Sequence, residues 1–174
     1  MTFPMAALIR LTLLGLYLAL VAPLPFLAPA AWRWQLVVAT ALGLGLMLAL
    51  TSERVEVDAT GLRVGHPSWC RWLLRRGWSL QWQEIRGLTP VATSQGGRVF
   101  YVRSSSGSAY LLPQRVERFD GFWHQFTEAT GLDTGDVGRI SPPWTYQLLA
   151  ILTALLLLGE LAMGWWAGFG QSLS

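Results

Sequence analysis

The stretch "WQLVVATALGLGLMLALTSERVEVD", from Trp34 to Asp58, changes character in its middle and divides the chain into two kinds of structure. Its first part carries no charge, and the nearest charges, Arg33 and Glu53, bracket 19 uncharged residues. About 20 apolar residues span the hydrocarbon core of a membrane, so this part predicts a transmembrane helix. The "RVEVD" at its end alternates apolar and polar residues, which predicts a strand. A membrane segment therefore leads directly into a domain that contains strands.

Two other segments of the chain have the same character as the first part of that stretch. Arg10 and Arg33 bracket 22 uncharged residues, and Arg139 and Glu160 bracket 20. The composition agrees, because 52% of the residues are hydrophobic, only 13% are charged, and the mean hydropathy is +0.39. We therefore expect a membrane protein with two transmembrane helices in residues 1–52 (about 6–27 and 34–51), a polar domain in residues 53–139, and a third helix with a short tail in residues 140–174.

The first apolar segment allows two interpretations. Pro23, Pro25 and Pro29 predict that the regular helix ends near Ala22. The "APA" at residues 28–30 also resembles the cleavage site of a secretory signal peptide. Residues 1–30 are therefore either a retained helix or a removed signal. In both cases the second helix delivers the polar domain to the same side of the membrane.

The distribution of arginine predicts the orientation. Arg10, Arg54 and Arg139 flank the apolar segments on the side of the polar domain, whereas Arg33 alone flanks them on the other side. Basic residues are enriched in cytoplasmic loops, so the polar domain is expected in the cytoplasm. Glu160, near the far end of the third segment, is predicted on the same side as Arg33. We therefore predict an intramembrane pair between Arg33 and Glu160, or a contact from Glu160 to a cation of a partner protein.

The polar domain shows the patterns of a small α+β fold. Alternating runs separated by turn signals predict about seven short antiparallel strands between residues 53 and 139. The run "QRVERFDGFWHQFTEATG" then places Val116, Phe119, Trp123 and Phe126 on one helical face, and Gly131 stands where a C-cap is expected. We expect this one amphipathic helix to cover a sheet or a small barrel.

The stretch "HPSWCRWLLRRGW", from His66 to Trp78, is rich in tryptophan and arginine. As a strand it would mix large apolar and charged side chains on both faces, which is poor for a core. As a helical turn it would group apolar side chains on one face with arginines beside them. The alternative is that the tryptophans fill the core of the sheet. We predict a surface that docks on lipid or on a protein partner and consists of Trp69, Arg71, Trp72, Leu73, Arg75 and Arg76.

Motifs for catalysis or metal binding are weak. His66 and His124 are the only histidines, and neither has metal-ligand spacing with Cys70. The triplet "DTG" at Asp133 matches aspartic proteases, but it follows the predicted helix end instead of an apolar strand. The eleven arginines of residues 53–139 against nine acids leave a charge of only +2, which disfavours nucleic-acid binding. We expect no catalytic, cofactor-binding or metal-binding residue, and therefore no enzyme.

The middle of the chain resembles a known kind of domain. The runs "WSLQWQEIRGL" (Trp78–Leu88) and "GRVFYVRSSSGSAYLLP" (Gly97–Pro113), with "W-x-E-I" at Trp82–Ile85 and "GLRV" at Gly61–Val64, are similar to bacterial pleckstrin-homology-like (PH-like) domains found beside membrane helices. The resemblance implies seven antiparallel strands and a C-terminal helix. It covers about half of the chain and assigns no functional residue.

The arrangement of two helices, this domain and a third helix also resembles small membrane proteins of cyanobacterial thylakoids and their plastid relatives. Some of these are accessory or assembly factors for photosynthetic complexes. The resemblance implies a non-catalytic accessory protein in a thylakoid or plasma membrane, which binds membrane lipids and the subunits of a larger membrane complex such as a photosystem. The alternative is a membrane module that binds lipid headgroups.

Overall fold

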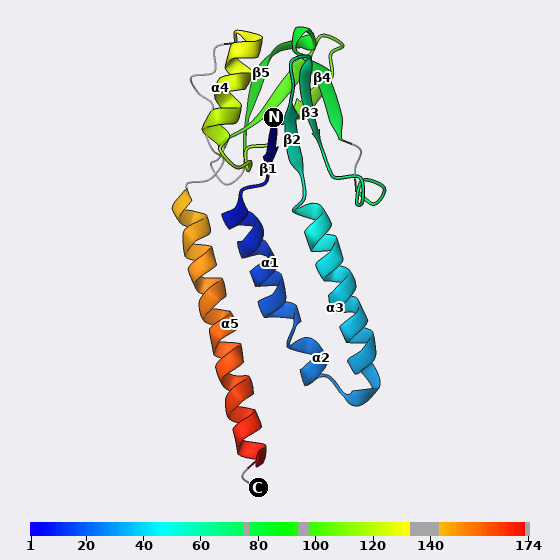
Figure 1. Ribbon diagram of the computed structural model, residues 1–174, viewed down its shortest axis with the longest axis vertical. Coiled ribbons are helices and arrows are strands. Elements are labelled where there is room, and N and C mark those ends of the chain that lie inside the picture. The colour runs from blue at the N-terminus through cyan, green and yellow to red at the C-terminus, as the bar shows by residue number, and fades with distance from the viewer. Residues whose placement is uncertain (75–76, 94–97, 133–142, 173–174) are drawn as a thin grey trace. The chain divides into compact units, whose positions relative to one another are not determined.

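The computed structural model describes residues 1–74, 77–93, 98–132 and 143–172. The chain divides into two compact units, of which one joins Met1–Ala7 to Ala49–Pro142 and the other joins Leu8–Leu48 to Pro143–Ser174. The first unit contains two antiparallel sheets and a helix, and the second unit is helical (Figure 1). The mixed α+β class predicted from the sequence is confirmed.

The helical unit is built from α1 (Ala7–Val21), α2 (Leu24–Leu27), α3 (Ala30–Leu50) and α5 (Pro143–Ser172). Three stretches, Ala7–Leu27, Ala30–Leu50 and Trp144–Trp166, are long and apolar enough to cross a membrane. The first of these is broken near Pro23, which caps the short α2. Proline lacks the backbone N–H that a continuing helix requires, so the break falls where the prolines predict it.

Close packing within the helical unit depends on small residues. The Tyr17 hydroxyl of α1 donates a hydrogen bond to the Thr40 carbonyl of α3, at 2.8 Å. A Cβ atom on Gly43 would lie 2.2 Å from that hydroxyl, so only glycine leaves room for the tyrosine. Gly15 of α1 likewise faces the side chain of Thr153 of α5. Small residues let neighbouring helices approach closely, and here they admit a hydrogen bond between two helices.

The first sheet contains four strands in the order β1 (Thr2–Pro4), β2 (Arg54–Val57), β3 (Gly61–Gly65) and β4 (Trp78–Gln81), all antiparallel. The tight turn between β2 and β3 depends on Asp58, which binds the backbone of Thr60 and Gly61. The turn predicted at residues 59–61 is therefore present.

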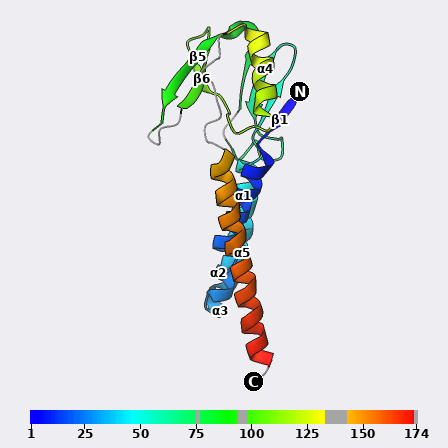
Figure 2. The ribbon, with the colours of Figure 1, turned by 90° about the vertical axis from the view of Figure 1, so that its left-hand side faces the viewer.

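The second sheet contains β5 (Ile85–Ala92), β6 (Arg98–Ser104) and β7 (Ala109–Leu111) in sequence order. The short helix η1 (Trp82–Glu84) connects the two sheets. In the view of Figure 2, the β5–β6 hairpin extends to one side of the helix α4 (Phe119–Thr130), and β1 lies on the other side. All strand pairs in this sheet are antiparallel, as the sequence predicted.

The strand β1 was not anticipated from the sequence, which assigned residues 1–52 to helices alone. It pairs with β2 on one side, and on the other Met5 forms an isolated bridge with Val116. Two backbone hydrogen bonds, from Ala6 to the Arg115 carbonyl and from Glu117 to the Pro4 carbonyl, extend this contact. The described part of residues 53–139 holds six strands, so the expectation of about seven strands there is corrected: the seventh comes from the N-terminus.

The core of the α+β unit lies between the two sheets and α4. Phe122 and Phe126 of α4 are fully buried, and Phe119 is nearly so. The sequence placed Trp123 on the buried stripe, but Trp123 is only partly buried and stacks on Phe126 with ring centroids 5.2 Å apart. Gly131 has φ +65° and its N–H binds the Thr127 carbonyl, so the predicted C-cap is confirmed.

Candidate docking surface

The segment between β3 and β4 leaves the sheet at the end where the chain joins the apolar helices. Gly65, the last residue of β3, is the register partner of Arg54, which in turn pairs with Pro4. Pro4 leads into α1 through Met5 and Ala6, and α3 leads into β2 through residues 51–53. The segment that follows Gly65 therefore starts at the same end of the sheet as both helix connections.

This segment folds into consecutive turns. The Pro67 carbonyl accepts hydrogen bonds from the N–H groups of Cys70 and Arg71, at 3.2 and 3.1 Å. The Cys70 carbonyl accepts from those of Leu73 and Leu74, at 3.0 and 3.2 Å. Bonds between residues three and four apart are those of helical turns, so the helical interpretation holds and the strand interpretation does not. We call residues 66–74 the β3–β4 loop.

The β3–β4 loop is anchored by one residue and exposes the large ones. Cys70 is buried, whereas the exposed fractions of Trp69, Trp72 and Leu73 are 55%, 81% and 51%. Arg71 is also exposed. The alternative that these two tryptophans fill the core is therefore wrong. Of the six predicted docking residues the structure places these four together on one loop, while Arg75 and Arg76 lie outside the described residues.

Trp78, the last tryptophan of the stretch, behaves differently. It lies in β4, packs against the hydrophobic core and stacks on Tyr110, with ring centroids 5.1 Å apart. Trp78 thus belongs to the packing of the core, whereas Trp69 and Trp72 of the β3–β4 loop are exposed. Alternation within β4 gave the signal for this difference, because it places Trp78 and Leu80 on the same face.

The exposed indole ring of Trp72 offers an apolar surface. Trp72 Nε1 donates a hydrogen bond to the Trp69 carbonyl, at 2.9 Å, so the polar atom of this ring is already satisfied. Burying a large apolar side chain contributes roughly 1.5–3 kcal/mol. Grouped apolar side chains on a surface mark sites of interaction with proteins or membranes, and single ones do not. Trp69, Trp72 and Leu73 form such a group.

A basic hollow of about 580 Å3 adjoins the loop. Arg63 and Ser79, which are register partners on β3 and β4, lie at its edge, and the β3–β4 loop supplies the remaining polar side chains. Arg63 and His66 are not among the docking residues predicted from the sequence. The alternation of "GLRV" places Arg63 outward and could have indicated it, but no sequence signal brings it near His66. The polar lining side chains are Arg63, His66, Ser68, Arg71 and Ser79.

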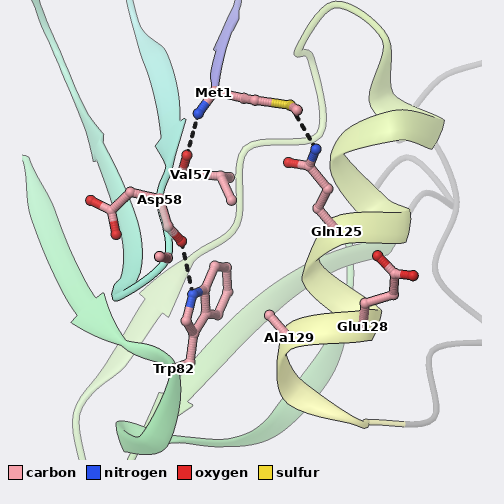
Figure 3. A pocket seen from close by; sticks show the side chains of 8 residues that line it. Met1, Val57, Asp58, Trp82, Gln125, Glu128 and Ala129 are labelled. Carbon is pink, nitrogen blue, oxygen red and sulfur yellow. Dashed lines mark hydrogen bonds between the residues drawn. The ribbon is translucent and has the colours of Figure 1, made fainter.

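A second hollow, of about 610 Å3, lies between the β2–β3 turn, η1 and α4 (Figure 3). Trp82 forms one wall, and its Nε1 donates to the Asp58 carbonyl at 3.0 Å. Gln125, Glu128 and Ala129 of α4 form the opposite wall. This hollow adjoins the end of β2 that is remote from Arg54, so it is at the other end of the sheet from the β3–β4 loop.

The Asp58 carboxylate beside this second hollow accepts hydrogen bonds from the turn that it stabilises. Its Oδ1 accepts from the Thr60 hydroxyl at 2.6 Å, from the Thr60 N–H at 2.8 Å and from the Gly61 N–H at 2.9 Å. The hydroxyl bond first, and then the two backbone bonds, hold the pKa of the Asp58 carboxyl below its usual value. The group acts as an ionised acceptor within the turn.

The other polar residues considered in the sequence are His124 and Asp133. Among the residues that the structure describes, no three His, Cys, Asp or Glu side chains are gathered as a metal site. His124 is an exposed residue of α4 whose Nδ1 lies 3.3 Å from Glu128, as expected for a histidine on a helix surface. Asp133 of the "DTG" triplet lies outside the described residues.

The predicted intramembrane pair is not formed. Arg33 and Glu160 are both described, and no ion pair joins them. Arg33 is the fourth residue of α3, and Glu160 is the eighteenth residue of α5. Each lies at a similar distance along its helix from the helix end that the chain joins to the α+β unit. A long charged side chain near the end of a membrane span, such as Arg33 at the start of Ala30–Leu50, can reach water without a partner.

Comparison with known proteins gives one relationship over nearly the whole chain. The chain is 40% identical over 167 residues to the "Uncharacterized protein slr0269" of Synechocystis sp. (strain ATCC 27184 / PCC 6803 / Kazusa), and the alignment covers 92% of this chain and 84% of that protein. No family model matches the chain. No solved structure matches it either.

Proposed function

The chain belongs to the family of the Synechocystis protein slr0269, and we propose that it is a non-catalytic membrane protein that binds a larger membrane complex through its β3–β4 loop. The observation that carries the proposal is the exposure of Trp69, Trp72 and Leu73 on one loop, at the end of the sheet joined to α1 and α3. Tryptophan and arginine are the residues enriched in protein-interface hot spots, which supports a role in binding.

The fold supports the assignment of the α+β unit as a PH-like domain. A four-stranded and a three-stranded antiparallel sheet are followed by a single helix, which gives the seven strands and C-terminal helix that the sequence resemblance implies. In this proposal the helices α1 to α3 are inserted between the first and second strands of the domain. The domain would then be fixed to its membrane anchor at three points of the chain.

The proposed membrane orientation follows from the connections of the chain. Because β1 and β2 pair with each other, the start of α1 and the end of α3 would lie on the same side of the membrane. The arginines of that side, Arg10 and Arg54, outnumber Arg33 on the other, so we place the α+β unit in the cytoplasm. The cyanobacterial relative supports a cyanobacterial protein, and we propose a thylakoid or plasma membrane as its location.

The partner in this proposal is a photosynthetic complex, which the chain helps to assemble or to stabilise. Three helices that are long and apolar enough to cross a membrane are consistent with a position in the same membrane as such complexes. The cyanobacterial relative and the exposed indoles support this partner class. The docking group is small, so we expect binding that is reversible and that depends on a few side chains.

The proposal is tested by affinity purification of the full-length chain from cyanobacterial membranes in a mild detergent, with the bound proteins identified and quantified by mass spectrometry. The test variant is the double substitution Trp72→Ala with Leu73→Ala. The matched control is Leu111→Ala, which removes a side chain that is 49% exposed on β7 of the same unit.

We expect the unmodified chain and the control to retain subunits of one membrane complex in a fixed ratio to the bait. The double variant is expected to lose at least nine-tenths of them, because a loss of two anchors of about 1.5–3 kcal/mol each exceeds a tenfold change in affinity. Equal retention by all three proteins, or the absence of any membrane-complex subunit from the unmodified chain, would contradict the proposal.

A further inference from the structure

Glu160 is a carboxylate inside a stretch that is apolar enough to cross a membrane. It lies in Trp144–Trp166, six residues before the end of that stretch, which is about 9 Å along a helix. Within the described part of the chain, no side chain forms an ion pair with Glu160. Acidic residues within membrane spans are costly, and they nearly always pair with another group or face water. The carboxylate of Glu160 is therefore a candidate for a contact outside its own chain.

Arg33 carries the opposite charge at a matching depth. It is the fourth of the 21 residues of α3, whose last residue leads to the α+β unit. Glu160 is the eighteenth of the 30 residues of α5, whose first residue follows the α+β unit. Seventeen residues therefore separate each from the helix end joined to that unit, which is about 26 Å at 1.5 Å per residue. In the proposed orientation, the guanidinium and the carboxylate lie at one level of the bilayer.

The middle helix α1 separates α3 from α5 within one chain. The Tyr17 hydroxyl of α1 binds the Thr40 carbonyl of α3, and Gly15 of α1 faces Thr153 of α5. Figure 1 shows α1 between α5 and α3, and the three helices overlap in Figure 2, which is turned by 90°. They therefore form one layer. At most 17% of each span is buried within the chain, so both faces of the layer are open to a neighbour.

Both charged residues lie near the sides of their helices that face α1. Arg33 precedes Thr40 by about two helical turns, and Glu160 follows Thr153 by about two turns, so each shares a side with a residue that contacts α1. Since α1 has 15 residues and spans about 22 Å, it ends before the level of the two charges. A Cβ atom on Gly164, one turn after Glu160, would meet nothing within 4 Å. Space for a second side chain therefore remains beside the carboxylate.

We propose that two copies of the chain associate through their helical layers, with Arg33 of each copy bound to Glu160 of the other. A two-fold axis perpendicular to the membrane carries every residue to the same depth in the second copy. Two groups can therefore pair across this axis only if their depths are equal. The same rotation places α3 of one layer against α5 of the other. Charge complementarity selects a second copy as the partner, because this chain supplies both members of the pair.

The dimer goes beyond the proposed function, because it concerns a contact between copies and requires no other protein. It contains two identical ion pairs, which compensate both carboxylates. It requires that the three helices cross the membrane. Binding of a complex through Trp72 and Leu73 is measured with separate variants, so either idea can fail alone.

The test measures association of full-length chains in phosphatidylcholine vesicles that contain no partner complex. Ser106→Cys in a Cys70→Ser background carries a donor fluorophore on some copies and an acceptor on others. Energy transfer is followed as the protein-to-lipid ratio rises. The charge variants are Arg33→Glu and Glu160→Arg, and the neutral variants are Arg33→Gln and Glu160→Gln. The matched control is Gln35→Glu, which adds a charge at an exposed position on another side of α3.

The decisive sample is an equimolar mixture of the two charge variants. The Arg33→Glu chain carries an acid at both positions, and the Glu160→Arg chain carries an arginine at both. Each variant alone would therefore place like charges in both pairs of a dimer, whereas a mixed dimer would contain two pairs of opposite charge. Mixing could not restore a pair that forms within one chain.

We expect energy transfer in the unmodified chain to exceed that of random proximity and to saturate as the protein-to-lipid ratio rises. Each charge variant alone should associate at least about tenfold more weakly, and the mixture should recover the affinity of the unmodified chain to within about threefold. The neutral variants should weaken association by a smaller factor, and Gln35→Glu should leave it unchanged. Resistance to extraction by alkaline carbonate verifies that each variant is inserted.

Three results would overturn the dimer. Energy transfer at the level of random proximity in the unmodified chain would show that no second copy binds, and would leave Glu160 to a different protein. A mixture that associates no better than either charge variant alone would exclude the two pairs. Equal losses in Gln35→Glu and Arg33→Glu would show a general effect of added charge.

The neutral variants decide the question if the charge variants fail to insert. Weakened association of both Arg33→Gln and Glu160→Gln would then support the two pairs. Association as strong as that of the unmodified chain in either neutral variant would contradict them.

Discussion

Pro4 and Arg54 are register partners in neighbouring strands, although α1, α2 and α3 separate them in the sequence. The three helices are therefore an insertion between β1 and β2. Both ends of this insertion return to one edge of the sheet, which places the start of α1 and the end of α3 together. Removal of residues 1–30 as a signal peptide would delete β1, so the pairing favours the retained helix.

The contribution of β1 can be measured through Phe3. This side chain is 5% exposed, belongs to the core, and meets Phe122 edge to face with ring centroids 5.6 Å apart. Phe3→Ala should lower the free energy of unfolding of the α+β unit by about 3–5 kcal/mol. Denaturant unfolding of the full-length chain in detergent, followed by circular dichroism in the β region, measures this change. A loss below about 1 kcal/mol would show that β1 is dispensable.

The packing of α1 on α3 is tested by two glycines of α3. A Cβ atom on Gly43 would lie 2.2 Å from the Tyr17 hydroxyl, whereas one on Gly45 would meet nothing within 4 Å. Gly43→Ala should displace Tyr17, break its hydrogen bond to Thr40 and destabilise the helical unit by about 1–3 kcal/mol. Gly45→Ala should have no cost. The aggregation temperatures of Gly43→Ala and Gly45→Ala in detergent measure the difference in stability. Equal aggregation temperatures would contradict this packing.

The turn at Asp58 gives a dependence of stability on pH. Hydrogen bonds lower the pKa of Asp58 in the folded chain, so its contribution is complete above the unfolded pKa of about 3.9 and is lost as pH falls through the folded pKa. Asp58→Asn should therefore lower the melting temperature at pH 6 and reduce its decline below about pH 4. Glu117→Gln, at another exposed carboxylate, serves as the control. An unchanged acid profile in Asp58→Asn would exclude the linkage.

The helical part of the fold was predictable because its signal is local. An uninterrupted apolar run of sufficient length fixes a helix such as α3 without reference to the rest of the chain. The strand β1 has no such signal. Thr2–Pro4 is three residues long and is defined by its pairing with β2, which depends on contacts between residues far apart in sequence.

The candidate site was predictable in part for the same reason. The exposure of Trp69 and Trp72 could be predicted from local sequence alone. A strand through these residues would mix large apolar and charged side chains on both of its faces, so neither face could be buried in a core. The hollow that both Arg63 and Arg71 line depends on the β3–β4 pairing and on the path of the loop. Neither can be predicted from the spacing of these residues in the sequence. Phe122 was missed because Trp123 fits the same helical spacing.

The membrane arrangement itself is tested most directly by thiol labelling in a Cys70→Ser background, in sealed vesicles with the cytoplasmic side outward. Ser106→Cys reports on the β6–β7 turn, and Pro29→Cys reports on the connection between α2 and α3. A membrane-impermeant maleimide should label Ser106→Cys at once and Pro29→Cys only after detergent is added. Labelling of both before detergent, the reverse order, or release of the chain from the membrane by alkaline carbonate would contradict three spans with a cytoplasmic domain.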